Sequence, residues 1–89
     1  MLHLLAFPPT RTDLTAMVEA CLNDNDAIVL LDQGLDWLAN VDALKALAGH
    51  ARTTLFALTS SDAGTITMLD YHGLILLTEQ HQANSSWYP

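Results

Sequence analysis

Cysteine and basic residues are scarce in this chain. Its 89 residues include one cysteine and three Lys or Arg, against ten Asp or Glu, which gives a net charge of −7. A single cysteine excludes an internal disulfide, so nothing indicates an oxidising compartment. Nucleic-acid binding needs a face rich in Lys and Arg that displaces counterions from phosphates. Three scattered cations cannot form such a face, so direct binding to RNA, DNA or an anionic membrane surface is not expected.

Long apolar runs are also missing at the amino terminus. The first run, "LHLLAF" at 2–7, has no basic residue before it and ends at Pro8. It is too short for the core of a signal peptide and far too short to span a bilayer. We therefore expect a cytoplasmic protein.

Motifs for metals, phosphates and nucleophilic catalysis are absent too. The four histidines have no ligand spacing, so they are expected at the surface or half-buried, and we expect no metal or cofactor. Gly34, in "DQGL", follows a predicted strand at a place where α/β proteins often bind ligands, but a tight turn explains one glycine equally well. Acidic pairs such as Asp24 and Asp26 are typical of turns and helix starts. No serine lies in a hydrolase elbow.

What the chain has in quantity is apolar sequence. Apolar residues make up 51% and charged residues 15%, and the mean hydropathy is +0.23. Globular chains contain about 25% charged residues. One small domain over residues 1–89 cannot bury that much apolar surface, and an exposed apolar patch usually marks a protein partner. We therefore expect the protein to work in an oligomer.

The hydrophobic pattern alternates between strands and helices. Strands are predicted at 2–7, 27–32, 53–59 and 65–69, and helices at 13–22, capped by Asp13, and at 35–48, with a candidate break at Asn40. The segment 70–81 fits a strand or a helix, and the tail at 82–89 reads as irregular. This order is typical of βαβ units. It predicts an α/β fold with a small, mainly parallel sheet of about four strands and helices on both faces.

Cys21 is the candidate for chemistry, as a thiol that accepts sulfur as a persulfide. Such a role needs an accessible thiolate. Cys21 lies on the apolar stripe of its predicted helix, between Val18 and Leu22, so we expect its side chain to face the sheet. The negative end of the helix dipole and the acidic residues that follow also disfavour a thiolate. These arguments favour a core position over a reactive one, and both remain open.

Two tryptophans are candidates for an interface. Trp87 lies near the end of the chain with few local partners, a position typical of interface packing but equally compatible with packing on its own domain. Trp37 lies within a predicted helix, where core packing is the favoured alternative to an interface.

Several segments, in order along the chain, resemble the DsrH/TusB-like subunits of bacterial sulfur-relay complexes. They are the opening "MLHLL" with a proline pair after it, "VEACL" before "AIVLLDQG", "TMLDYHGLILLTEQH", and Trp87 near the end. The turn reads Asp-Gln-Gly where the family more often has Asp-Gly. The resemblance spans nearly all of the chain, and it implies that residues 70–81 form a helix.

The resemblance implies a DsrE/DsrF/DsrH-type domain that assembles with homologous DsrE/TusD-like and DsrF/TusC-like subunits. In that family sulfur passes over a cysteine persulfide of the DsrE-like subunit to a DsrC/TusE-like acceptor. The implied role is a mainly structural, non-catalytic subunit of a sulfurtransferase complex, with Cys21 at the position of a first-helix cysteine in Dsr-type members. Both tRNA wobble-uridine 2-thiolation and dissimilatory sulfur oxidation fit.

Two other function classes stay open. One is a free-standing thiol enzyme in which Cys21 alone is catalytic, although no nearby cation supports it. The other is a small homo-oligomeric regulatory domain that binds a ligand near Gly34, although a glycine-rich loop is missing.

Overall fold

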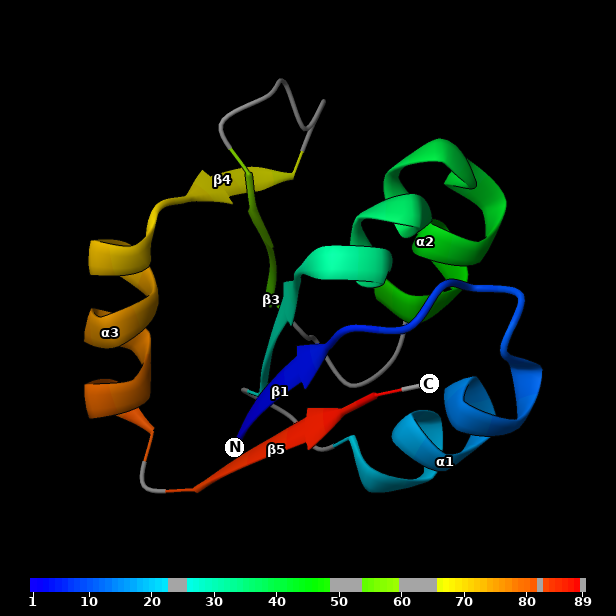
Figure 1. The fold of residues 1–89 in the computed structure, drawn as a ribbon. Coiled ribbons are helices and arrows are strands. Elements are labelled where there is room, and N and C mark those ends of the chain that lie inside the picture. Colours follow the sequence, from blue (N-terminus) through cyan, green and yellow to red (C-terminus); the bar gives the residue numbers. More distant parts are fainter. Residues whose placement is uncertain (23–25, 49–53, 60–65, 82, 89) are drawn as a thin grey trace.

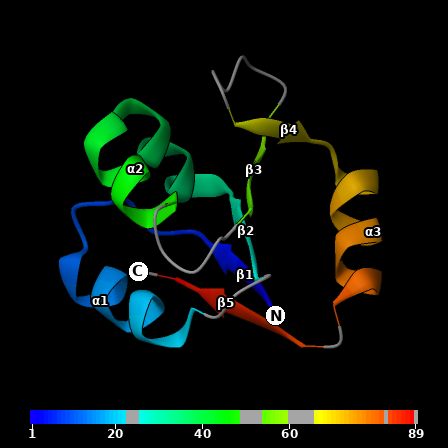
Figure 2. The same cartoon turned by 180° about the vertical axis from the view of Figure 1, so that it is seen from behind.

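A computed structural model describes residues 1–22, 26–48, 54–59, 66–81 and 83–88 (Figures 1 and 2). Strands and helices alternate along the chain. The elements are β1 (Leu2–Leu5), α1 (Thr12–Cys21), β2 (Ala27–Leu30), the 3-10 helix η1 (Asp32–Ala39), α2 (Val41–Ala48), β3 (Thr54–Leu58), β4 (Thr67–Leu69), α3 (Tyr71–Gln80) and β5 (Asn84–Trp87).

The strands form one sheet in the order β4-β3-β2-β1-β5, and every neighbouring pair is parallel. The predicted α/β fold with a mainly parallel sheet is therefore confirmed, with five strands instead of about four. The additional strand is β5, in the tail that was predicted to be irregular. Its sequence, "NSSW", lacks the β-branched and apolar residues that mark buried strands, because β5 lies at the edge of the sheet and pairs with β1 alone.

Helices cover both faces of the sheet, as predicted (Figure 1). Among the described residues, α1, η1 and α2 cover one face, where Leu5, Ile28, Leu30 and Leu55 form a core with Trp37. On the other face, Leu2 and Val29 are packed by side chains of α3. Strands β1 and β2 are buried on both sides, which explains why they read as apolar runs.

Local signals at the helix ends are partly as expected. The break at Asn40 is confirmed, and the Asn40 side chain accepts a hydrogen bond from the amide of Ala43 at 3.1 Å. The segment after Asp70 is a helix, and Asp70 caps it by accepting from the amide of Gly73 at 2.7 Å. Asp13 is not the cap of α1, which begins one residue before it at Thr12.

Candidate functional site

A pocket of about 720 Å³ opens at the carboxyl end of the sheet. In open α/β sheets this is the usual place for a ligand, because the loops that follow parallel strands meet there. The pocket lies where the chain leaves β2 for η1, leaves β3, and passes from β4 into α3. Its lining residues are Asp32, Leu35, Leu58, Thr59, Met68, Leu69, Asp70 and Tyr71.

Two carboxylates are the charged groups of this lining. Asp32 has a φ of 51°, in the left-handed region that aspartate tolerates better than most side chains. One carboxylate oxygen of Asp70 accepts the capping hydrogen bond from Gly73. Among the described residues, no Lys or Arg forms an ion pair with either aspartate. The pocket therefore combines two carboxylates that no described Lys or Arg pairs with and the side chains of leucine, methionine and tyrosine.

Gly34 is explained by packing next to this pocket. A Cβ at Gly34 would lie 1.9 Å from the carbonyl oxygen of Leu5, so η1 approaches the end of β1 as closely as only glycine allows. The amide of Gly34 donates to the carbonyl of Leu31 at 2.8 Å. The close approach accounts for this glycine without a ligand loop.

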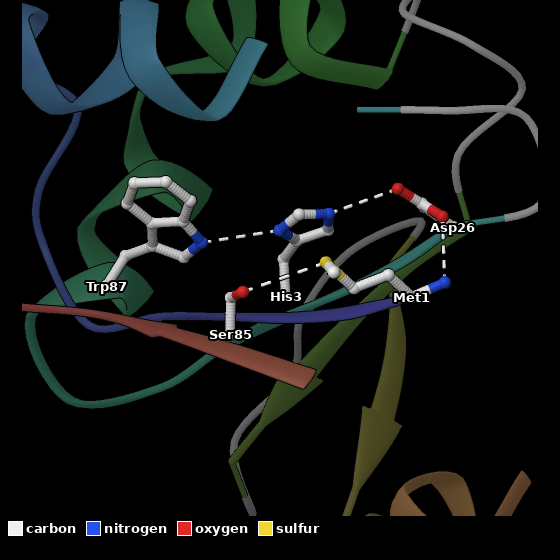
Figure 3. Close-up of polar contacts among 5 residues, drawn as sticks. All are labelled: Met1, His3, Asp26, Ser85 and Trp87. Atoms are coloured by element: carbon white, nitrogen blue, oxygen red, sulfur yellow. Dashed lines mark hydrogen bonds and ion pairs between the residues drawn. The ribbon is translucent and has the colours of Figure 1, made fainter. Parts of the chain in front are cut away.

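A buried polar network lies near the amino end of the sheet (Figure 3). His3 is 0% exposed and Asp26 is 4% exposed. The Nε2 atom of His3 lies 3.1 Å from Oδ2 of Asp26, whose Oδ1 accepts from the amino terminus of Met1 at 2.9 Å. On the other side of the ring, the indole N–H of Trp87 donates to Nδ1 of His3 at 3.3 Å, and the two rings stack. This arrangement uses the tautomer of His3 that carries its proton on Nε2.

The network ties β1, β2 and β5 together, because His3 lies in β1, Asp26 directly precedes β2 and Trp87 ends β5. The expectation that the histidines are at the surface or half-buried is wrong for His3. Asp26, expected in a turn or at a helix start, directly precedes β2 and is a buried partner of His3. The sequence does contain a signal. A histidine in the middle of the apolar run at 2–7 must find a polar partner when that run is buried. His3 has no exposed surface with which to contact a substrate, so we interpret its place in the network as structural.

Cys21 is exposed at the last position of α1. The expectation that its side chain faces the sheet is therefore wrong. Val18 is the buried residue of α1, and Leu14 and Leu22, four positions to either side, pack against the core. Cys21 and Met17, which is also exposed, lie together beside that stripe.

The fold separates Cys21 from the pocket. Helix α1 runs back from the carboxyl end of β1 to the amino end of β2, so its last residue lies toward the amino end of the sheet. The pocket lies at the carboxyl end. The structure therefore does not combine the thiol with the two aspartates in one site.

The two tryptophans have different positions. Trp37 is 1% exposed, its indole N–H donates to the carbonyl of Phe7 at 2.9 Å, and its ring packs edge-to-face on the Phe7 ring. It fills the core, which is the alternative that the sequence favours for this residue, and at 1% exposure its side chain has almost no surface to offer a partner. Trp87 is half-buried in edge strand β5, and its interface role stays a prediction.

A metal site or a membrane span would leave a recognisable arrangement of side chains or helices. In the described parts of the chain, no three His, Cys, Asp or Glu side chains gather closely enough to hold a metal ion. No described helix has the length and apolar composition needed to cross a bilayer.

Comparison with known proteins identifies the family. Over 96 aligned positions the chain is 31% identical to Protein TusB of Serratia proteamaculans (strain 568), with 98% of this chain and 100% of that protein covered. The chain belongs to the TusB family. Protein TusB of Pectobacterium parmentieri is 27% identical with the same coverage. The resemblance to DsrH/TusB-like subunits is thus confirmed, although no family model matches the chain.

The fold is also shared with a solved structure. The solution NMR structure of Protein Tm0979 from Thermotoga maritima matches with a TM-score of 0.57 and covers 92% of this chain and 95% of that one. Its sequence is 15% identical, so this likeness supports the α/β fold alone.

Proposed function

We propose that this chain is a subunit of a sulfur-relay complex that serves 2-thiolation of the tRNA wobble uridine in the cytoplasm. The observation that carries the proposal is the relationship to two proteins named TusB over nearly the full length of the chain. Of the two branches that the resemblance allows, this one is favoured because both relatives bear the Tus name. Dissimilatory sulfur oxidation is the alternative branch.

In this proposal the chain is a partner-binding subunit and not the main sulfur carrier. Its partners are the DsrE/TusD-like and DsrF/TusC-like subunits, and through them a DsrC/TusE-like acceptor. The structure supports an architectural role in two ways. The buried His3–Asp26 pair is closed off inside the protein, and the large exposed apolar side chains are available for contacts with other subunits.

Cys21 is the candidate for a direct contribution to sulfur transfer. Its exposure gives a donor protein access to the thiol. In that step the Cys21 thiolate attacks the terminal sulfur of a donor persulfide. An S–S bond forms on Cys21, the S–S bond of the donor breaks, and the donor cysteine leaves as a thiolate.

Complementation tests the proposal. The chain is expressed in a bacterial strain whose own TusB-like gene has been deleted, together with TusC-like and TusD-like subunits from the organism that supplies the chain. We expect 2-thiouridine in tRNA, measured by mass spectrometry of nucleosides, to return to the level of the undeleted strain. We expect the three subunits to co-purify.

Three further outcomes separate the alternatives. If Cys21→Ser restores 2-thiouridine as well as the wild-type chain does, the role is architectural; if it fails while the complex still forms, Cys21 carries sulfur. A complex that forms but leaves 2-thiouridine absent contradicts the tRNA branch and favours sulfur oxidation. A chain that is folded and monomeric in the presence of the other subunits contradicts the proposed function.

A further inference from the structure

Exposed apolar side chains concentrate next to the pocket. Four of the seven large hydrophobic side chains that are exposed in the described parts of the chain lie on β4 and α3. They are Met68 (51% exposed), Tyr71 (76%), Ile75 (55%) and Leu76 (46%), and we call them the β4–α3 patch. Tyr71 and Ile75 are four positions apart and therefore adjacent on the helix surface. Met68 and Tyr71 also line the pocket, so patch and pocket form one continuous surface.

This surface is negative. Asp32 and Asp70 supply the charge of the pocket, and Glu79 lies exposed further along α3. The cations of the described chain lie elsewhere. Arg11 precedes α1 and pairs with Asp13, and Lys45 belongs to α2. Helices α1 and α2 lie on the other side of the sheet from α3 (Figures 1 and 2). No described cation therefore neutralises the two pocket carboxylates.

We propose that the pocket and the β4–α3 patch together bind a basic segment of a partner protein. A Lys or Arg side chain of the partner enters the pocket and pairs with Asp32 and Asp70, and the apolar neighbours of that side chain cover Met68, Tyr71 and Ile75. A Lys or Arg side chain suits such a place because its apolar stem can lie along leucine and methionine while its charged end reaches a carboxylate.

Charge complementarity selects this occupant. A second copy of the chain carries the same net charge of −7, and its own pocket carboxylates would face like charges across the interface. A small amine could pair with the aspartates but would leave the β4–α3 patch in water. The inference rests on the proposed function in one respect, since it assigns the face through which a relay subunit contacts a partner.

The first experiment maps the surface with defined probes. The full 15N-labelled chain is titrated with a blocked hexapeptide of leucine and lysine, and separately with the same peptide carrying glutamate in place of lysine. We expect the lysine peptide to shift amide signals at 32–35, 58–59 and 68–75, to bind more weakly as salt rises, and to bind more tightly than the glutamate peptide. Shifts located elsewhere, or equal binding of the two peptides, would overturn the proposal.

Charge-neutral variants then test the two carboxylates. The double variant Asp32→Asn, Asp70→Asn keeps the cap of α3, because asparagine caps helices as well as aspartate does. We expect it to bind the lysine peptide at least about tenfold more weakly, since two charge-assisted contacts are lost. Asp42→Asn, in the exposed first turn of α2, is the matched control and should bind as the wild type does. Equal binding by the double variant would contradict the role of the pocket.

The natural partner is tested by co-purification with the TusC-like and TusD-like subunits. We expect the double variant Tyr71→Ser, Ile75→Ser to be lost from the complex, whereas Met17→Ser, an equally exposed apolar position on α1, is retained. If both are retained, the surface proposal is wrong and the proposed function stands. If the wild-type chain itself fails to join, the proposed function is wrong, and the peptide titration still decides on the surface. Self-association of the chain that Tyr71→Ser, Ile75→Ser abolishes would overturn the basic-partner assignment.

Discussion

Replacing Gly34 by alanine should destabilise the protein far more than the same change at Gly73. The new Cβ would lie 1.9 Å from the carbonyl oxygen and 2.9 Å from the carbonyl carbon of Leu5. Both are backbone atoms, so no rotamer change can relieve the overlap. Ordinary contact needs 3.4 Å or more, so η1 and the end of β1 must move apart by more than 1 Å.

The strain can be estimated from comparable changes. Extra methylene groups in packed cores cost about 1–3 kcal/mol, and occasionally more. The upper end applies here because the carbonyl of Leu5 also accepts the hydrogen bond from the amide of Leu31 at 3.1 Å, which joins β1 to the end of β2. Replacing glycine by alanine within a helix, by itself, raises the free energy of unfolding by up to about 1 kcal/mol, which offsets part of the strain. We therefore expect a net loss of about 2–3 kcal/mol, a large part of the roughly 5–15 kcal/mol of a typical domain.

Urea unfolding followed by tryptophan fluorescence measures this loss. With an m value of about 1.5 kcal/mol/M, the midpoint should fall by about 1.3–2 M. Gly73→Ala is the matched control, because its Cβ would meet the flexible end of the Leu69 side chain at 2.9 Å. In α3 this change should be neutral or stabilising by up to about 1 kcal/mol. If the free energy of unfolding of Gly34→Ala lies within about 0.5 kcal/mol of the wild-type value, η1 does not approach β1 as closely as the structure places it.

Three other measurements test separate features of the structure. Trp37→Phe should cost about 2–3 kcal/mol in urea unfolding, because it leaves the buried carbonyl of Phe7 without its donor and opens a void; a loss below 0.5 kcal/mol would contradict this packing. Native Cys21 should react with an alkylating reagent at a rate of the same order as the unfolded chain, and protection until denaturation would contradict its exposure. The hydrogen bond from Arg11 lowers the pKa of Asp13, so Arg11→Ala should raise that pKa toward the ordinary value in a carboxyl NMR titration. The Arg11–Asp13 pair stabilises the folded state at pH values above the pKa of Asp13 in the unfolded chain, and this stabilisation is lost as the pH falls through the lower pKa of Asp13 in the folded state. An unchanged Asp13 titration in Arg11→Ala would refute the pair.

The sequence predicts the interior elements of this fold well. Apolar runs at 2–7, 27–32 and 53–59 mark strands because parallel strands are covered on both faces. The break at Asn40 is foreseeable because asparagine caps helices better than it continues them. The edge strand β5 cannot be predicted from such patterns, since it is held by backbone pairing with β1 and needs no apolar side chains of its own.

The site is harder to predict than the fold. The apolar stripe of α1 through Leu14, Val18 and Cys21 is wider than the part of the helix that packs on the sheet. The sequence does not show which edge of such a stripe is exposed, because that depends on how the helix packs. The pocket is formed by residues from η1, β3, β4 and the start of α3, far apart in sequence. Asp32 and Asp70 become neighbours of one pocket only through the strand order β4-β3-β2.

The separation of Cys21 from the pocket leads to a prediction about how the two would act in a complex. The ten residues of α1 span about 15 Å, which places Cys21 well away from the carboxyl end of the sheet where the helix begins. Sites more than about 7–10 Å apart without shared partners contribute additively, usually within about 0.5 kcal/mol. We therefore expect Cys21→Ser and the double variant Asp32→Asn, Asp70→Asn to change the affinity of the chain for its partner subunits independently. Binding free energies of the two variants and of their combination, measured by titration calorimetry, test this expectation. A coupling above 1 kcal/mol would mean that one partner contacts both ends of the sheet at once, and sulfur held on Cys21 would then lie in the same interface as the pocket.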